Sequence, residues 1–143
     1  MEMLKLGLDY GVFGLLGAMS FVVVAYAVER HLYYKRLELA GFTHAEQLRI
    51  ALTRHLTTIA SLGSNAPYVG LLGTVLGILV TFHDLASGDG AFDTGTVMLG
   101  LALALKATAL GLVVAIPSIV LYNGLLRRVD ELTARWRLLQ EGA

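Results

Sequence analysis

One lysine lies in the middle of a long apolar stretch of this sequence. Lys106 is the only charged residue between Asp93 and Arg127, within the segment GLALALKATALGLVVAIPSIV. A lysine at the centre of a bilayer costs about 3 kcal/mol or more, so an ionisable group at that depth is functional by default. We therefore expect Lys106 to serve assembly or partner contact.

Three kinds of partner are open to the Lys106 amine: a carboxylate, the backbone carbonyls of a crowded interface, or water reached by its long stem. Water is the least suitable, because Lys106 lies well inside the apolar stretch. Asp84 is the nearest candidate partner within the chain, but it belongs at the outer membrane surface. A partner from another copy or another protein is the better expectation.

Small residues form two regularly spaced sets in the apolar stretches. They recur every three or four positions, which places each set on one face of a helix. Such faces allow helices to approach closely in lipid, and they can also line a cavity. We expect helix packing or a lumen at Pro67, Gly70, Gly73, Gly77 and Thr81, and at Gly100, Ala104, Gly111, Ala115 and Ser118.

Each set also contains one threonine near the middle of its stretch, Thr74 in the first and Thr108 in the second. A threonine in a membrane helix commonly donates to its own i−4 carbonyl and does nothing more. Two hydroxyls on small faces at similar depth nevertheless favour a polar lining, and we predict that both line a pore. Lys106 lies about 200° around the helix from Thr108, so it belongs to a different face.

Other chemistry finds no support in the residue pattern. The chain has no Cys, and its four His residues are scattered without metal-ligand spacing. Gly70, Gly73 and Gly77 lie inside an apolar stretch that follows no strand, which argues against a phosphate-binding loop. The formal net charge is zero, so nucleic acid is not an expected partner. We predict no metal, no cofactor and no enzymatic activity.

The elements that would position these residues are membrane helices. Of the 143 residues, 56% are hydrophobic and 15% charged, against roughly 25% charged in soluble domains. Apolar stretches with at most one charged residue predict transmembrane helices at 10–28, 66–85 and 95–122, in one integral membrane domain over 1–143. This composition excludes a soluble enzyme. The first stretch could instead be a signal peptide, but its nineteen uncharged residues are too many and the preceding segment is net negative.

The distribution of positive charge predicts the orientation in the membrane. Nine of the eleven Lys and Arg residues lie in the segment 29–65 or in the tail after residue 122. The positive-inside rule places both in the cytoplasm, with the N-terminus and the loop 86–94 on the periplasmic side.

The cytoplasmic segment is predicted to contain a helix at 44–62. Thr43 and Glu46 fit a capping box, and leucines recur at helical spacing after them. The sequence GSNAP at 63–67 should end this helix, with Pro67 in the first turn of the next one.

The third transmembrane helix is predicted to continue into the cytoplasm as a tail helix at 123–139. Pro117 should kink it, because proline leaves one carbonyl without its N–H partner. A long cytoplasmic extension and small packing faces together favour assembly as a ring.

Two segments carry a resemblance to a known family. NAPYVGLLGTVLGILVTF at 65–82 and GLALALKATALGLVVAIPSIVLYN at 100–123 resemble the ExbB/TolQ/MotA family of proton-channel subunits, most closely its ExbB branch. The pair Glu29 and Arg30 after the first stretch also fits. The resemblance covers nearly the whole chain.

The resemblance implies a function and a set of partners. Family members form a homo-pentamer in the bacterial inner membrane, around the transmembrane helices of ExbD. They use the proton motive force to energise TonB for outer-membrane uptake of iron chelates and cobalamin. The proton-accepting aspartate belongs to ExbD, which fits the lack of Asp and Glu in the stretches 10–28, 56–82 and 94–126. The family's pore-lining threonines fall on Thr74 and Thr108.

The chain departs from longer ExbB proteins in two respects. It lacks their large cytoplasmic insertions, so it resembles a compact subtype. Those proteins carry a glutamate at the position of Leu103, whereas this chain has Lys106 one turn later. Two alternatives stay open: a TolQ-like subunit of the Tol envelope-maintenance motor, and a structural scaffold whose small faces only pack.

Overall fold

The chain forms an elongated all-helical rod in the computed structural model, which describes residues 2–88 and 93–142. The helices are α1 (Glu2–Arg36), α2 (Ala45–Thr53), α3 (Leu56–Ser87) and α4 (Thr94–Glu141), with a short 3-10 turn at Leu39–Gly41. Three of the described helices, α1, α3 and α4, are long and apolar enough to cross a membrane. The predicted all-α fold with three such helices is confirmed.

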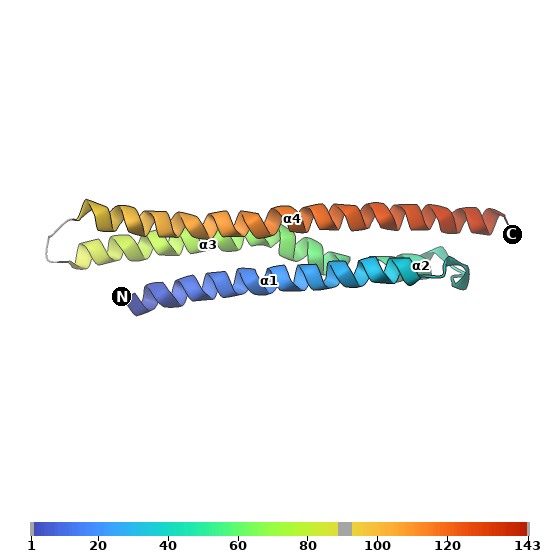
Figure 1. Ribbon diagram of the computed structural model, residues 1–143, viewed down its shortest axis with the longest axis horizontal. Coiled ribbons are helices and arrows are strands. Elements are labelled where there is room, and N and C mark those ends of the chain that lie inside the picture. Colours follow the sequence, from blue (N-terminus) through green and yellow to red (C-terminus); the bar gives the residue numbers. More distant parts are fainter. Residues whose placement is uncertain (1, 89–92, 143) are drawn as a thin grey trace.

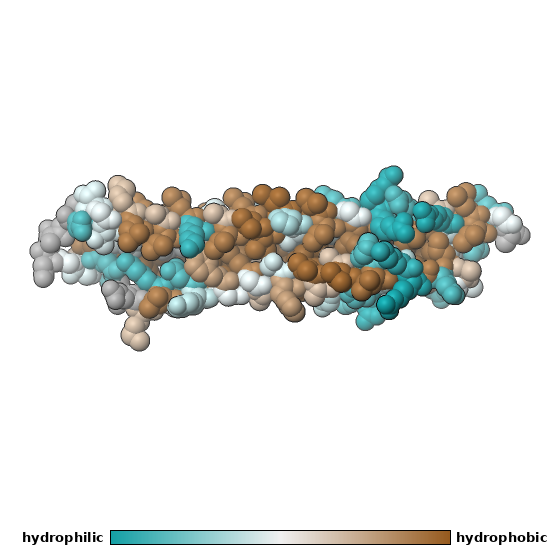
Figure 2. Space-filling view, viewed as in Figure 1, coloured by the Kyte–Doolittle hydropathy of each residue, from teal (hydrophilic) through white to brown (hydrophobic). Residues whose placement is uncertain are grey.

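The three long helices run side by side (Figure 1). α3 and α4 are antiparallel because only a short connection joins them, and α1 packs against both. The predicted periplasmic loop 86–94 falls partly outside the described residues. Figure 2 shows hydrophobic side chains over the middle of the rod and hydrophilic ones gathered toward the end where α2 lies. This distribution suits a rod whose middle is in lipid.

α4 is one continuous helix of 48 residues, which gives a length of about 70 Å. It therefore passes from the third apolar stretch into the polar tail without a break, through Pro117. Figure 1 shows no sharp bend along the length of α4. Asp93 caps the helix by accepting from the Thr96 hydroxyl and the Gly95 N–H, and these bonds hold the pKa of Asp93 below its ordinary value.

The predicted end of the cytoplasmic helix at GSNAP is wrong. α3 begins at Leu56 and continues through Gly63 and Pro67 to Ser87. Tertiary packing explains the difference: Ala66 is fully buried and Gly63 lies against Ser118 of α4, so this segment stays helical despite its local preference. Figure 1 shows α3 bent part-way along, as expected for a helix with an internal proline.

The helix predicted at 44–62 is instead broken in two. It stops at Thr53, and His55 adopts a left-handed conformation with φ of 68° before α3 starts. The predicted capping box is also wrong, because the N-cap is His44 and the Thr43 hydroxyl donates to Gln47 Oε1 at 3.4 Å. With the helix starting one residue later, Thr43 is too far from the N3 amide to cap it.

The break is held by side chains from one face of α1. Arg30 Nη1 donates to the Ala51 carbonyl at 2.7 Å, and the Tyr34 hydroxyl donates to the Leu52 carbonyl. Both carbonyls are in the last turn of α2, which leaves its carbonyls without helical partners. The His55 ring stacks on Tyr26 at 4.3 Å between centroids. α1 therefore supplies the groups that the interrupted helix lacks.

These contacts surround a hydrophobic core at the polar end of the rod. The predicted leucine stripe contributes to it, and Trp136 of the tail joins it while donating Nε1 to the Phe42 carbonyl at 3.0 Å. α2 is thereby fixed against both α1 and the tail of α4. The buried members are Val23, Ala27, Tyr34, Leu48, Leu52, Leu56, Ile59, Leu125, Val129, Leu132 and Trp136.

Candidate functional site

The hydroxyls of Thr74 on α3 and Thr108 on α4 are hydrogen-bonded to one another. Thr74 is only 7% exposed and Thr108 is half-buried, so the pair lies between the two helices and is reached from the Thr108 side. Residues thirty-four positions apart thus form one polar site inside an apolar bundle. Their pore-lining role stays a prediction, since a pore requires further chains.

Backbone carbonyls complete this polar site. Thr74 Oγ1 lies 2.9 Å from the Ala104 carbonyl of α4 and 3.3 Å from the Gly70 carbonyl of its own helix. Thr108 Oγ1 lies 3.5 Å from the same Gly70 carbonyl. The shortest of these carbonyl contacts crosses between helices, so Thr74 does more than bond its own i−4 carbonyl.

The two hydroxyls together have two protons to donate. In one arrangement Thr108 donates to Thr74, and Thr74 donates to Ala104. In the other, Thr74 donates to Thr108, and Thr108 donates to the more distant Gly70 carbonyl. A hydroxyl is both donor and acceptor, so either order satisfies the pair. The shorter contact favours the first arrangement.

Glycines allow α3 and α4 to come close enough for this contact. The Gly70 and Gly111 backbones face each other so closely that a Cβ on Gly70 would lie 2.7 Å from the Ala107 carbonyl oxygen and 3.0 Å from Gly111 Cα. A Cβ on Gly111 would lie 2.8 Å from the Ala66 carbonyl oxygen. These are backbone atoms, which move only if the helices separate.

The two predicted small-residue sets therefore meet each other within one chain. Gly77 faces Ala104 and Gly100 faces Thr81, which places both sets in the seam between α3 and α4. Ala115 is buried in the same region. The hydroxyls of Thr81 and Ser118 donate to their own i−4 carbonyls, at 2.9 and 2.6 Å, so only the central threonines bond across the seam.

α1 covers one side of this seam. Gly73 lies against both Ala107 of α4 and Val12 of α1, where its missing Cβ would meet atoms at 2.9 and 3.0 Å. Leu16 and Met19 of α1 pack with Ala66 and Ala115 in a second buried cluster. The opposite side of the seam carries no element among the described residues, which leaves it open to another chain.

Lys106 lies outside the seam. It is exposed on α4, and no carboxylate within the described ranges 2–88 and 93–142 comes within ion-pair distance of its amine. Asp84, the carboxylate considered above as a partner, is bound instead to Lys5 of α1, with Nζ 3.0 Å from Oδ2. The expectation that Lys106 finds its partner in another chain stays a prediction.

Two ionic contacts were not predicted from the sequence. Lys5 and Asp84 join the N-terminal end of α1 to the C-terminal end of α3, and nothing in their spacing indicates that they meet. Arg30 is 3% exposed, binds both carboxylate oxygens of Glu29 at 2.5 and 2.6 Å, and lies 4.3 Å from the Tyr33 ring. The hydrogen bonds from Arg30 hold the pKa of Glu29 below its ordinary value. Arg30 is buried where it binds the end of α2, so its burial can be predicted only when the position of α2 is known.

Comparison with known sequences identifies the family. The model of the MotA/TolQ/ExbB proton channel family matches residues 28–138, which include α2, α3 and most of α4.

The chain belongs to the MotA/TolQ/ExbB proton channel family.

Relatives within this family resemble the chain over nearly its full length. It is 47% identical over 140 residues to the biopolymer transport protein ExbB of Helicobacter pylori, covering 98% of this chain and 96% of that protein. It is 51% identical over 139 residues to ExbB of Aquifex aeolicus, covering 97% and 93%. The predicted resemblance to a compact ExbB is confirmed, and the chain is a multi-pass membrane protein of a proton-channel family.

The match to the TolQ branch is more restricted. The chain is 41% identical over 99 residues to the Tol-Pal system protein TolQ of Pseudomonas aeruginosa, which covers 64% of this chain and 42% of that protein. The ExbB branch is therefore favoured by both identity and coverage.

Proposed function

We propose that this chain is the proton-channel subunit of an inner-membrane motor that, together with ExbD, uses the proton motive force to energise TonB-dependent outer-membrane uptake. The observation that supports this most directly is the hydroxyl pair of Thr74 and Thr108 between α3 and α4. Hydroxyls can pass or solvate a proton but cannot hold one as a carboxylate does. The carboxylate would come from the partner.

The charge pattern supports a proton path in which this chain supplies the hydroxyls and a partner chain supplies the carboxylate. The apolar stretches 10–28, 56–82 and 94–126 contain no Asp or Glu, and a proton path through lipid requires a titratable group near mid-membrane. In the proposed assembly five copies surround the ExbD helices, whose aspartate lies beside the threonine pair. The open side of the seam, opposite α1, is the face that would border this lumen.

The decisive experiment replaces both threonines by valine, which keeps their shape and removes both hydroxyls. The Thr74→Val/Thr108→Val variant is co-expressed with ExbD and TonB in cells that lack their own ExbB. We expect the complex to assemble but proton uptake into vesicles to fall by at least about a hundredfold, the lower end of the range for one general acid–base contact. Growth on scarce iron should then be lost. Normal growth and proton uptake in this variant would contradict the proposal.

Ser118→Ala is the matched control. Ser118 is 3% exposed in the same seam, but its hydroxyl donates only to the Val114 carbonyl of its own helix. Its loss should leave proton uptake unchanged. If Ser118→Ala and the threonine variant are impaired alike while the amount of complex falls in both, the small faces serve packing alone and the scaffold alternative is correct.

A TolQ-like role in the Tol envelope-maintenance system is the second candidate, supported by the partial match to TolQ. The two roles are distinguished by complementation of deletion strains. Restored growth on iron chelates supports the TonB role, whereas restored resistance to detergents without restored iron uptake supports the Tol role.

A further inference from the structure

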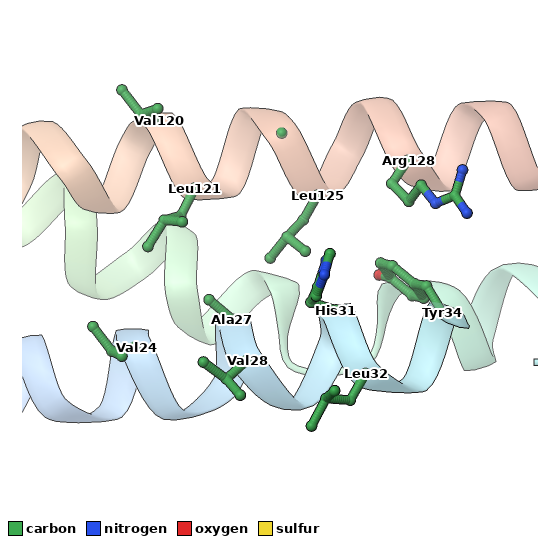
Figure 3. Close-up of a pocket in the computed structure, with 11 residues that line it drawn as sticks. Val24, Ala27, Val28, His31, Leu32, Tyr34, Val120, Leu121, Leu125 and Arg128 are labelled. Atoms are coloured by element: carbon green, nitrogen blue, oxygen red, sulfur yellow. The ribbon is translucent and has the colours of Figure 1, made fainter. Parts of the chain in front are cut away.

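An apolar groove lies between α1 and α4, away from the threonine pair (Figure 3). It has a volume of about 490 Å³, within the roughly 300–1,000 Å³ typical of small-molecule sites. Val24 and Val28 line it on α1, and Leu121 lines it on α4. Figure 3 shows Leu121 and Leu125 pointing from α4 toward α1. These side chains make the walls of the groove apolar.

One end of the groove is polar and cationic. His31 points from α1 toward α4 in Figure 3, and Arg128 lies beyond it on α4. The Arg128 guanidinium is 3.3 Å from a Glu131 carboxylate oxygen, and Arg127 is 3.4 Å from the other oxygen of the same carboxylate. Two guanidinium groups thus share one carboxylate, so this group of three side chains has a net charge of +1.

The groove lies at a defined level along the length of the rod. It runs from Val24 to Tyr34 on α1 and from Val120 to Arg128 on α4, across the positions where both helices change from apolar to cationic sequence. This is the level of the lipid headgroups on the side with more Lys and Arg. Basic pockets between transmembrane helices on that side bind anionic lipid headgroups.

We propose that the groove binds an anionic phospholipid, with an acyl chain between α1 and α4 and its phosphate at Arg128 and His31. The alternative occupant is a helix from a second copy of the chain. Copies in one membrane have the same orientation, so a neighbouring tail would bring its own Arg127 and Arg128 to this level. Like charges disfavour that contact, and an anion relieves them.

Native mass spectrometry of the delipidated full-length protein tests the proposal. The probes are dioleoyl phosphatidylglycerol, which is anionic, and dioleoyl phosphatidylcholine, which has the same acyl chains and no net charge. We expect the anionic lipid to bind about fivefold more tightly, the effect of one basic residue at the membrane surface. Glycerol phosphate, which has no acyl chain, should not bind; equal binding of glycerol phosphate would reduce the site to a phosphate contact and overturn the proposal.

Arg128→Gln and Arg127→Gln form a matched pair, because both arginines contact Glu131 but only Arg128 lines the groove. Arg128→Gln should abolish the preference for the anionic lipid, and Arg127→Gln should retain it. If both variants lost the preference for the anionic lipid equally, diffuse surface charge would attract the lipid, which contradicts a specific site.

Gly124→Leu tests the apolar part of the groove. Gly124 lines it, and a Cβ added there meets no atom within 4 Å, so a larger side chain can leave the backbone at this position without a clash at its Cβ. Both lipids should bind at least about fivefold more weakly, as expected from burial of one leucine-sized apolar group. Gly17→Leu is the control, since Gly17 is equally open and lies outside the groove. Unchanged lipid binding in Gly124→Leu, with or without loss of the oligomer, would overturn the proposal.

Discussion

Gly70 and Gly111 determine how closely α3 and α4 approach. Gly70→Ala should separate the helices, because the new Cβ would lie 2.7 Å from a backbone oxygen and 3.0 Å from Gly111 Cα. Overpacking of this kind costs about 1–3 kcal/mol. We expect a matching loss in the free energy of unfolding in detergent, and loss of the contact between Thr74 and Thr108.

The control for this prediction is Gly17→Ala on α1, where an added Cβ meets nothing within 4 Å. Alanine is the better helix former, so this variant should be as stable as the parent or slightly more stable. A Gly70→Ala variant that unfolds at the same denaturant concentration as Gly17→Ala would show that the seam tolerates separation.

At the residue scale the sequence predicts much of the site. The spacing of Gly70, Thr74 and Gly77 identifies one face of α3, and that of Ala104, Thr108 and Gly111 identifies one face of α4. It does not indicate that these faces meet within one chain, because helical periodicity gives a direction around each axis and not the identity of the neighbour. The contact itself shows that the two faces pack against each other, and the lining of a pore stays a prediction.

At the scale of elements, the break between α2 and α3 depends on α1. Tyr34→Phe removes the hydroxyl that binds the Leu52 carbonyl and leaves that buried acceptor without its partner. The expected loss is about 1–3 kcal/mol in the free energy of unfolding. Amide hydrogen exchange in α2 should rise, because the end of that helix loses its anchor to α1.

Tyr33→Phe is the neighbouring control. The Tyr33 ring lies beside Arg30, but its hydroxyl has no hydrogen-bond partner within the part of the chain that the structure describes. Removal of the Tyr33 hydroxyl should leave both the free energy of unfolding and the amide hydrogen exchange of α2 unchanged. Similar exchange in the two variants would mean that the hydrophobic core alone holds α2 in place.

The long helices are predictable from hydropathy, whereas the cytoplasmic break is not. Uncharged stretches indicate α1, α3 and α4, because only a helix satisfies its own backbone groups in lipid. Gly63 and Pro67 suggest a loop by local preference, yet Gly63 packs against Ser118 of α4 and the helix continues through both residues. His55 carries no sequence signal for a left-handed residue, and its conformation follows from the Arg30, Tyr34 and Tyr26 contacts.

At the scale of the whole molecule, the exposed Lys106 predicts assembly. Lys106→Met should weaken the ring or its complex with the partner helices, because the variant removes a charge that finds no carboxylate in the described part of its own chain. The expected result is a shift from oligomer toward monomer in native mass spectra. Activity should fall in proportion to the amount of complex lost.

Lys106→Arg retains the charge and should retain the oligomer. If Lys106→Met yields an intact and fully active complex, the lysine takes no part in assembly. A monomeric mass for the unmodified protein in mild detergent would contradict the ring prediction itself, independently of Lys106.

The hydroxyl pair between α3 and α4 has a consequence beyond the static bundle. In each of its two orders of hydrogen bonding, one hydroxyl donates across the seam and the other donates back to a carbonyl of the first helix, so a change of order reverses only the bond between the hydroxyls. A charge brought to the open side of the pair favours one order, and removal of that charge allows the other to return. Each turnover of a titrating neighbour would therefore reverse the bond between the two hydroxyls while the helices stay where they are.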